Sequence, residues 1–181
     1  QENALDKLFV NLCPNNTDLN DVLIKVCTLN DFYSTNIYGV TKVAKKIKEL
    51  SIDSRLNSSV RDTAIVQDLD EAVKKETGKS IYSFATKYCS HHKPNIYPIY
   101  DSYVDLLLRY YRDNEGLLSA IRFDDNDLSN YDTFCKVIDA FRQFYGLQQY
   151  SVKEIDKYLW QVGKKCFPKW KNSENNDDVV E

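Results

Sequence analysis

The chain has 181 residues, of which 43% are hydrophobic, 28% charged and 13% aromatic. These values exclude collagen-like, disordered and disulfide-scaffold proteins, and the length fits one domain or two small lobes. With only 5 glycines and 4 prolines, a turn-rich all-β layout is disfavoured, because hairpins and tight bends depend on those residues.

The charge balance is slightly acidic, with a net charge of −3. A basic shell of the kind that binds nucleic acid non-specifically is therefore absent. Four acids and one base lie in the polar tail from Lys171 to Glu181, and without that tail the positive and negative charges balance. We expect residues 171–181 to be disordered and residues 1–170 to form one helical domain, or two small lobes.

The sequence also carries expectations about location and cofactors. It has no uncharged apolar run of about 18 residues, and Gln1-Glu2-Asn3 lacks the basic start of a secretory signal, so we expect a cytoplasmic protein without a membrane partner. The five cysteines are widely spaced and form no Cys-x-x-Cys pair, which indicates reduced, mostly buried thiols. We expect no metal and no cofactor.

In chain order, the apolar residues first recur at helical spacing after Thr17, the predicted N-cap of a helix that ends near Leu29. A polar and aromatic connector follows, and a second helix is predicted from Val40 to Leu50. A third runs from about Ser59 to Lys75, and Gly78 ends it as a C-cap. Its predicted inward side chains are Val60, Ala64, Leu69 and Val73.

The second half continues the pattern. A helix from Lys79 to His92 ends before Pro94, because the residue before a proline avoids helical backbone angles. Asp101 or Ser102 caps the next helix, and another runs from about Leu128 to Tyr145. Ser151-Val152-Lys153-Glu154 is a capping box that starts the last helix. The sequence predicts an all-α, compact bundle of about seven or eight helices.

Two short motifs resemble parts of known ligand sites, but each lacks the other residues that such a site needs. Thr77-Gly78-Lys79-Ser80 ends like a phosphate-binding loop, but Val73 stands where that loop needs a glycine and a helix precedes it instead of a strand. We therefore expect no nucleotide cofactor. Cys89-Ser90-His91-His92 gathers three metal-ligating side chains, but no second pair exists to complete a zinc site.

The most distinctive segment runs from Ser80-Ile81-Tyr82-Ser83-Phe84-Ala85-Thr86-Lys87-Tyr88 into Tyr97-Pro98-Ile99-Tyr100-Asp101-Ser102-Tyr103-Val104. It resembles the core of the helix-hairpin-helix base-excision DNA glycosylase superfamily, in which a helix, a loop with a proline and an aspartate, and another helix follow one another. The segment from Asp21 to Ile47 is similar to the family's first buried helix and the turn after it. The resemblance implies that Asp101 is a catalytic carboxylate beside a helix N-terminus.

Other expectations follow from the same resemblance. Bifunctional members carry a lysine nucleophile, for which Lys79 is the closest counterpart, about two residues out of register, whereas Lys87 lies too far along. The family's Gly-x-Gly turn is missing, since only Gly78 stands near its place. The implied partner is double-stranded DNA. The candidate DNA-binding residues are Lys42, Lys45, Lys46, Tyr97, Tyr100 and Tyr103.

Each of these interpretations has an alternative. The lysines between Val40 and Leu50 also fit the solvated face of an ordinary helix, and Asp101 also fits a simple N-cap. The motif pair, together with Asp156-Lys157-Tyr158-Leu159-Trp160, is also similar to uncharacterised bacterial proteins. Two functions therefore stay open, an enzyme that flips and excises a modified base and a non-catalytic helical interaction module. A cleft at Asp101 would favour the enzyme, and a covered Asp101 would favour the module.

Overall fold

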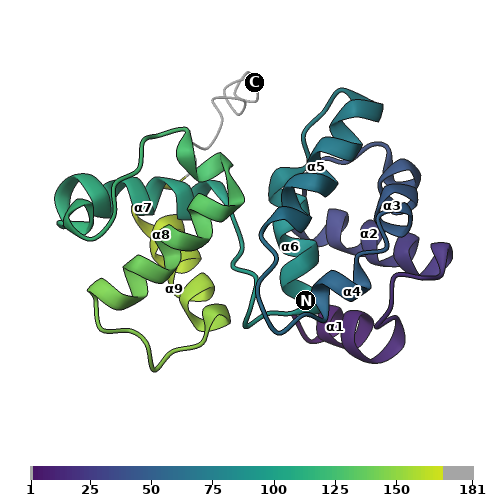
Figure 1. Cartoon of the computed structure of the whole chain (residues 1–181), viewed down its shortest axis with the longest axis horizontal. Coiled ribbons are helices and arrows are strands. Elements are labelled where there is room, and N and C mark those ends of the chain that lie inside the picture. The colour runs from purple at the N-terminus through teal and green to yellow at the C-terminus, as the bar shows by residue number, and fades with distance from the viewer. Residues whose placement is uncertain (1, 169–181) are drawn as a thin grey trace, which may run out of the picture.

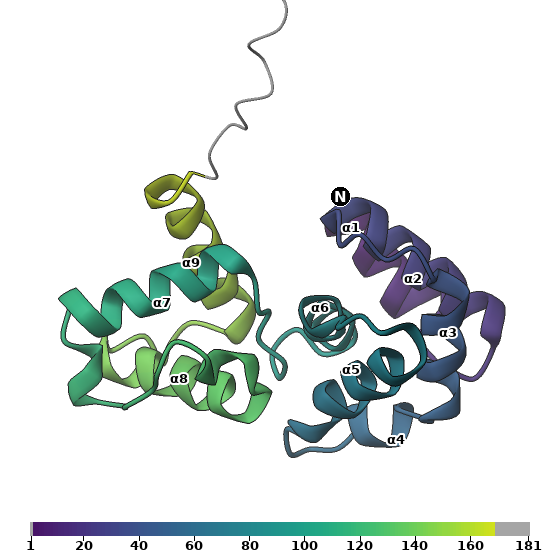
Figure 2. The same cartoon turned by 90° about the horizontal axis from the view of Figure 1, so that it is seen from above.

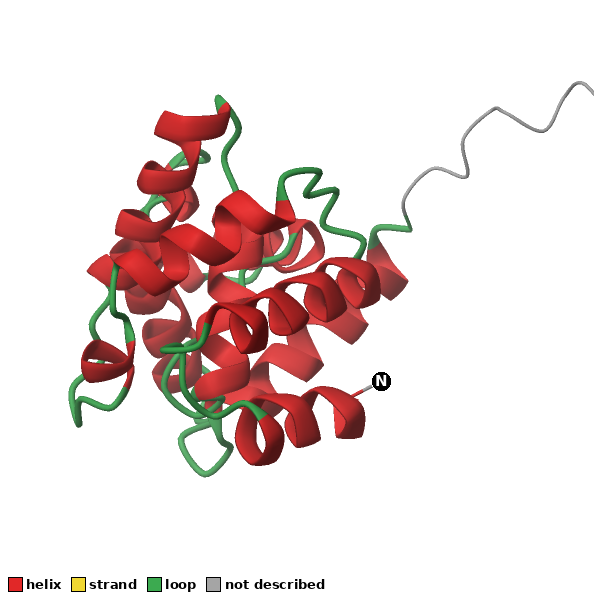
Figure 3. Ribbon diagram, turned by 90° about the vertical axis from the view of Figure 1, so that its right-hand side faces the viewer, coloured by secondary structure: helices red, strands yellow, loops and turns green. Residues whose placement is uncertain are grey.

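The computed structural model describes residues 2–168, and this part of the chain is all-helical, with no strand (Figure 3). This confirms the predicted fold class. The predicted tail from Lys171 to Glu181 lies outside the described residues. None of the helices that the structure describes is long and apolar enough to cross a membrane.

The N-terminal group of helices comprises seven elements that pack side by side (Figure 1). They are α1 (Glu2–Asp6), a π-helix (Lys7–Leu12), α2 (Leu19–Tyr33), α3 (Val40–Glu49), α4 (Asp53–Leu56), α5 (Ala64–Thr77) and α6 (Tyr82–His92). Helix α6 lies on the side of this group that faces the rest of the molecule (Figure 2). Eight consecutive residues of α6, 84–91, are buried, so this helix is covered all round.

The C-terminal group is smaller and follows the loop of residues 93–101, which passes from one group to the other (Figure 2). It contains α7 (Ser102–Asn114), α8 (Tyr131–Phe144) and α9 (Val152–Cys166), with two short 3-10 turns between α7 and α8. The buried apolar side chains of both groups form one hydrophobic cluster. Arg61 Nη1 also reaches across to Asp139 Oδ2 at 2.9 Å.

Helices α7 and α9 approach each other closely at Gly163. A Cβ atom on Gly163 would lie 2.6 Å from the carbonyl oxygen of Tyr103. Only glycine therefore lets α9 pack this tightly against the first turn of α7. This contact sets the position of α9 beside the loop that precedes α7.

Some predicted boundaries were wrong. Asp18 caps α2 instead of Thr17, and its side chain accepts from the amides of Asn20 and Asp21. The helix predicted from Ser59 begins only at Ala64, and Val60, predicted to point inward, is 72% exposed. Residues 57–63 form a loop instead, in which Arg61 Nε donates to the carbonyl of Ile96 at 2.6 Å. The C-cap prediction for Gly78 is confirmed, with a left-handed φ of 75°.

Candidate functional site

A cavity of about 440 Å³ lies where the two groups of helices meet. Its walls come from α1, the end of α2, α6, the loop of residues 93–101, the start of α7, and α9. The apolar and aromatic part of the lining is Leu5, Phe32, Tyr33, Pro94, Ile99, Val104 and Trp160. This volume falls within the range of small-molecule pockets.

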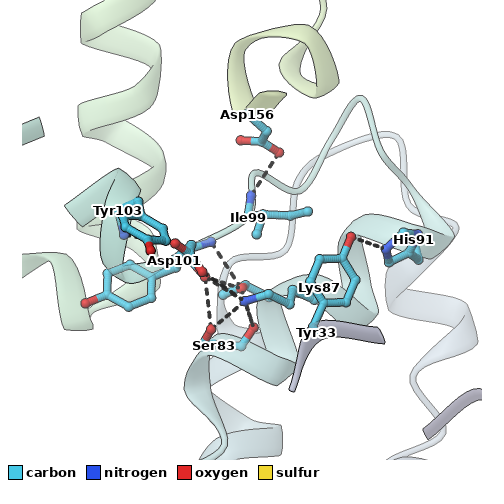
Figure 4. A network of polar contacts seen from close by, with 10 residues as sticks. Tyr33, Ser83, Lys87, His91, Ile99, Asp101, Tyr103 and Asp156 are labelled. Atoms are coloured by element: carbon cyan, nitrogen blue, oxygen red, sulfur yellow. Dashed lines mark hydrogen bonds and ion pairs between the residues drawn. The ribbon is translucent and has the colours of Figure 1, made fainter. Parts of the chain in front are cut away.

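Asp101 lines this cavity and also caps α7. Its Oδ1 accepts a hydrogen bond from the Tyr103 amide at 2.9 Å, and its Oδ2 lies 3.9 Å from Lys87 Nζ (Figure 4). Asp101 therefore caps α7, as expected, and also lines a cavity. The carboxyl group thus faces both the amide end of α7 and an ammonium group.

Lys87 is the lysine that the structure brings to Asp101. It projects from α6 with only 4% of its side chain exposed, and it donates to Ser83 Oγ at 2.6 Å and to the Tyr100 carbonyl at 3.3 Å. Its ammonium lies 5.5 Å from the centroid of the Tyr33 ring. Lys79, the expected nucleophile, does not line the cavity. Its ammonium lies over the Tyr38 ring, 5.1 Å from the centroid.

The loop that carries Asp101 is held from several sides, which fixes the carboxylate in place. On the α6 side, the Tyr100 amide donates to Thr86 Oγ1 at 3.1 Å and Ser83 Oγ donates to the Tyr100 carbonyl at 3.1 Å. On the other side, the Ile99 amide donates to Asp156 Oδ2 at 3.0 Å (Figure 4). The Tyr131 hydroxyl donates to the Pro98 carbonyl at 2.8 Å.

Asp156 is a second carboxyl group in the cavity lining, placed there by α9. It is 7% exposed, and its Oδ1 is buried without a hydrogen-bond partner. Burial raises the pKa of Asp156 well above its usual range, although the hydrogen bond from the Ile99 amide and the positive charges of Arg61 and Lys87 act in the opposite direction. Burial thus favours the protonated form of the Asp156 carboxyl group.

His91 and Tyr33 form an uncharged pair in the lining. The Tyr33 hydroxyl lies 3.0 Å from His91 Nε2 (Figure 4). Burial lowers the pKa of His91 to about 4 and raises the pKa of Tyr33 to about 12. At neutral pH both side chains are therefore uncharged, and the contact between them joins two neutral groups.

The histidine–cysteine motif does not form a metal site in the structure. His92 Nε2 lies 3.3 Å from Lys25 Nζ, whereas His91 contacts Tyr33. Cys89 is fully covered, and burial raises the pKa of its thiol to about 12. Among residues 2–168, no three histidine, cysteine or acidic side chains lie close enough to hold a metal ion.

The candidate DNA-binding lysines lie on α3, outside the cavity lining. Lys42 and Lys45 are exposed. Lys46 forms ion pairs with Glu49 at 2.8 Å and with Glu76 at 3.3 Å, so its charge is already shared with two carboxylates.

The three candidate tyrosines fall into different environments. Tyr97 is 1% exposed, with its ring 6.5 Å from that of Tyr131, so as a core residue it presents no surface for a base, contrary to the prediction. Tyr100 packs against the core and its hydroxyl donates to Asp105 Oδ1 at 3.2 Å. Tyr103 is half-buried next to Asp101 (Figure 4). None of the three lines the cavity.

The rim of the cavity carries two lysines of α9. Glu2 lies 2.8 Å from Lys153 Nζ and 2.9 Å from Lys157 Nζ, and these hydrogen bonds lower the pKa of Glu2 to about 2. The residues Tyr33 and Trp160 are 39% and 41% exposed. These side chains form a partly open entrance.

Sequence reasoning missed Lys87, Asp156, Tyr33 and His91. One signal could have pointed to Lys87 and His91. They share a face of α6 with Phe84 and Tyr88 at spacings of three, four and seven residues, so a lysine stands within an apolar stripe.

Comparison with known proteins places the chain in a family. Residues 1–96, more than half of the chain, match HI_0787_N, described as an N-terminal domain. A Haemophilus influenzae protein described as an uncharacterized protein is 41% identical over 157 residues, which cover 86% of this chain and 73% of that protein. No solved structure matches the chain. The chain belongs to the HI_0787_N family.

Proposed function

We propose that the chain is a DNA-glycosylase-like enzyme that takes an extruded, modified base into the cavity and breaks the bond between the base and its deoxyribose. Asp101 is the catalytic carboxylate. The observation that carries the proposal is that Asp101 lines a cavity beside the buried ammonium of Lys87. The resemblance of residues 80–104 to the helix-hairpin-helix glycosylases supports the same assignment.

The environment of Asp101 suits this chemistry. Loss of a base builds positive charge on the sugar, and a carboxylate fixed beside that position stabilises the transition state without reorganisation. The Tyr103 amide and Lys87 hold the Asp101 carboxylate in place. The bonds to Tyr100 and Ile99 hold the loop that carries it.

The walls of the cavity suit a planar ring. Phe32, Tyr33 and Trp160 provide aromatic surfaces on which an extruded base can stack. Lys153 and Lys157 at the rim provide cations for the phosphates beside the extruded nucleotide, in exchange for their contacts with Glu2.

In this proposal Lys87 takes the role that was expected of Lys79. As a nucleophile, Lys87 would first give a proton to Asp101 Oδ2, 3.9 Å away, and its Nζ would then bond to C1′ of the sugar. The bond from C1′ to the base breaks in that step, and the base leaves with the electron pair and takes a proton from water. When the C1′–O4′ bond then opens and the nitrogen passes a proton to O4′, the lysine is held as a Schiff base, which borohydride reduces to a stable cross-link.

A non-catalytic helical module is the second candidate, and the bonds of Lys87 favour it. Its ammonium ties α6 to the Tyr100 carbonyl, while Asp101 caps α7. Both residues thus also have structural roles that need no substrate.

Single-turnover cleavage of a panel of duplexes, each with one modified base, decides between the two. We expect the wild type to excise at least one base, Asp101→Asn to be slower by about a hundredfold or more, and Lys79→Gln to match the wild type. Borohydride should trap the wild type and not Lys87→Gln if the lysine attacks the sugar. A panel without any cleavage, or equal rates for Asp101→Asn and the wild type, would leave only the module.

A further inference from the structure

Helix α9 carries a basic face that begins at the mouth of the cavity. Its residues follow one another at spacings of four, three and four positions, which places them within about 60° around the helix. They are Lys153, Lys157, Trp160 and Lys164. The first three line the cavity. Lys164 follows one turn beyond Trp160, and its Nζ lies 4.7 Å from the centroid of the Trp160 ring.

The side chains of this basic face are open to solvent, so a ligand can reach them. The exposed fraction of the side chain is 31% for Lys153 and 52% for Lys157, and both Trp160 and Lys164 are exposed. Helix α9 has four lysines and two acids, of which Asp156 is buried and the other belongs to the capping box. The basic face is therefore a local concentration of positive charge in a chain whose net charge is −3.

The cavity end of the basic face already holds a carboxylate from another helix. Glu2 Oε1, on α1, lies 2.8 Å from Lys153 Nζ and 2.9 Å from Lys157 Nζ. Asp6 Oδ1 lies farther away, 3.5 Å from Lys153 Nζ. One oxygen of Glu2 thus accepts from two ammonium groups, and phosphate oxygens form charge-assisted hydrogen bonds of the same kind. A ligand that brings a phosphate to this pair of lysines has to displace Glu2.

We propose that the basic face of α9 binds the phosphodiester backbone of one DNA strand, and that Glu2 occupies the cavity end of this face until a DNA phosphate displaces it. The inference rests on the proposed function in naming DNA as the partner. It adds the surface on which the strand lies, and it gives this role to α9 instead of the lysines of α3.

The spacing of the lysines fits a nucleic-acid strand. At a rise of about 1.5 Å per residue, Lys153 and Lys157 lie about 6 Å apart along α9, and Lys164 lies about 10 Å farther on. One DNA strand carries a phosphate about every 3.4 Å along the duplex axis, so the basic face spans about five phosphates. Trp160 lies between the second and third lysines, where its ring can stack on a base of the bound strand. The α3 lysines lie outside the cavity lining, whereas a strand on α9 passes its mouth.

A short duplex with a tetrahydrofuran abasic analogue at its centre is the probe. It has no base to excise at that position, so binding is measured apart from cleavage. Fluorescence anisotropy of the labelled duplex gives the association constant of the full chain at several salt concentrations. We expect Lys157→Gln and Lys164→Gln each to weaken binding and to reduce the slope of log K against log salt concentration by about 0.9, because each lysine releases about one counterion.

Two further variants test the other parts of the proposal. Trp160→Leu should weaken binding by about fivefold or more with little change in the slope, because stacking on a base releases no counterion. Glu2→Gln should strengthen binding by about two- to fivefold, since the carboxylate that competes for the two lysines is removed.

Lys45→Gln is the matched control. Lys45 is an exposed lysine on α3, outside the cavity lining, so its replacement should leave the affinity and the slope unchanged. A reduced slope in Lys45→Gln with an unchanged slope in Lys157→Gln would place the strand on α3 and overturn the proposal. A wild type that does not bind the duplex would overturn it too, and a Glu2→Gln variant that binds no more tightly than the wild type would overturn the role of Glu2.

The same variants separate this proposal from the proposed function. A reduced slope in Lys157→Gln and Lys164→Gln, without cleavage of any modified duplex, would refute the glycosylase and leave the DNA-binding surface standing. Cleavage of a modified duplex, with unchanged slopes in both lysine variants, would refute the surface and leave the glycosylase standing.

Discussion

Replacing Asp101 by asparagine should keep the cap of α7 and remove the negative charge beside Lys87. Asparagine caps as well as aspartate, so the Tyr103 amide keeps its acceptor. The Coulomb attraction between charges about 4 Å apart amounts to about 4 kcal/mol at an effective dielectric constant of about 20. The Asp101 side chain is 21% exposed, and Lys87 keeps Ser83 and Tyr100 as acceptors, which reduces the loss.

We therefore expect Asp101→Asn to lower the free energy of unfolding by about 1–2 kcal/mol. Asp101→Ala should lower it by about 1 kcal/mol more, because the cap is also lost. A cap alone would make the asparagine variant nearly neutral. The free energy lost in Asp101→Asn thus reports on the ion pair, and the further loss in Asp101→Ala reports on the cap.

Urea unfolding at pH 7 of the wild type, Asp101→Asn, Lys87→Met and the double variant gives the coupling energy between the two side chains. We expect about 1–2 kcal/mol, with little change between 0.15 and 1 M salt because the Lys87 side chain is buried. A coupling below about 0.3 kcal/mol would refute the ion pair and with it the argument that Lys87 positions the Asp101 carboxylate.

Three further predictions concern the packing and the buried titratable groups. Gly163→Ala should lower the free energy of unfolding by about 1–3 kcal/mol, because its Cβ would lie 2.6 Å from the Tyr103 carbonyl, whereas Gly39→Ala, whose Cβ would meet nothing closer than 3.8 Å, should change the melting temperature little. Equal melting temperatures of the two variants would contradict the close contact of α7 with α9. Burial lowers the pKa of His91 to about 4 and of His92 to about 3, so the unfolded chain takes up protons near pH 6.5 that the folded chain does not. Each histidine should therefore reduce stability by up to about 1.4 kcal/mol per unit as the pH falls from 6.5 towards 4, and urea unfolding that is independent of pH over this range would argue against buried, neutral imidazoles. Asp156 acts in the opposite direction, because its raised pKa means that the folded chain keeps a proton that the unfolded chain releases above pH 4. The melting temperature of Asp156→Asn, taken relative to the wild type, should thus be higher at pH 7 than at pH 4, and a difference that is the same at both pH values would contradict the raised pKa.

Helical periodicity was sufficient to predict the long helices, because α2, α3, α8 and α9 each bury one apolar stripe. It failed for the stretch before α5. Val60 fits a helical stripe with Ala64, but Asp62 accepts from Arg55 at 3.2 Å and Arg61 donates to Ile96, so this stretch folds as a loop. Such contacts join residues distant in the sequence, and no local pattern reports them.

The candidate site was predictable only where a local motif marked it. Asp101 stands between a proline-containing loop and a helix, and both neighbours lie in the same short segment. Lys87 depends on the Tyr100 carbonyl, 13 residues further along, to satisfy its buried ammonium. Asp156 lies next to Ile155 in the buried stripe of α9, and only its distance to Ile99, 57 residues away in the chain, shows what it contacts.

The two carboxyl groups of the cavity lie in different environments. Asp101 lies at the N-terminus of α7, with its Oδ2 3.9 Å from Lys87 Nζ, whereas Asp156 is buried with one amide donor, and burial raises its pKa. In the proposed reaction, positive charge builds on the sugar as the base leaves, and Asp101 is the group proposed to face it. The position of Asp101 depends on both groups of helices, because α6 holds its loop through Tyr100 and α9 holds it through Ile99.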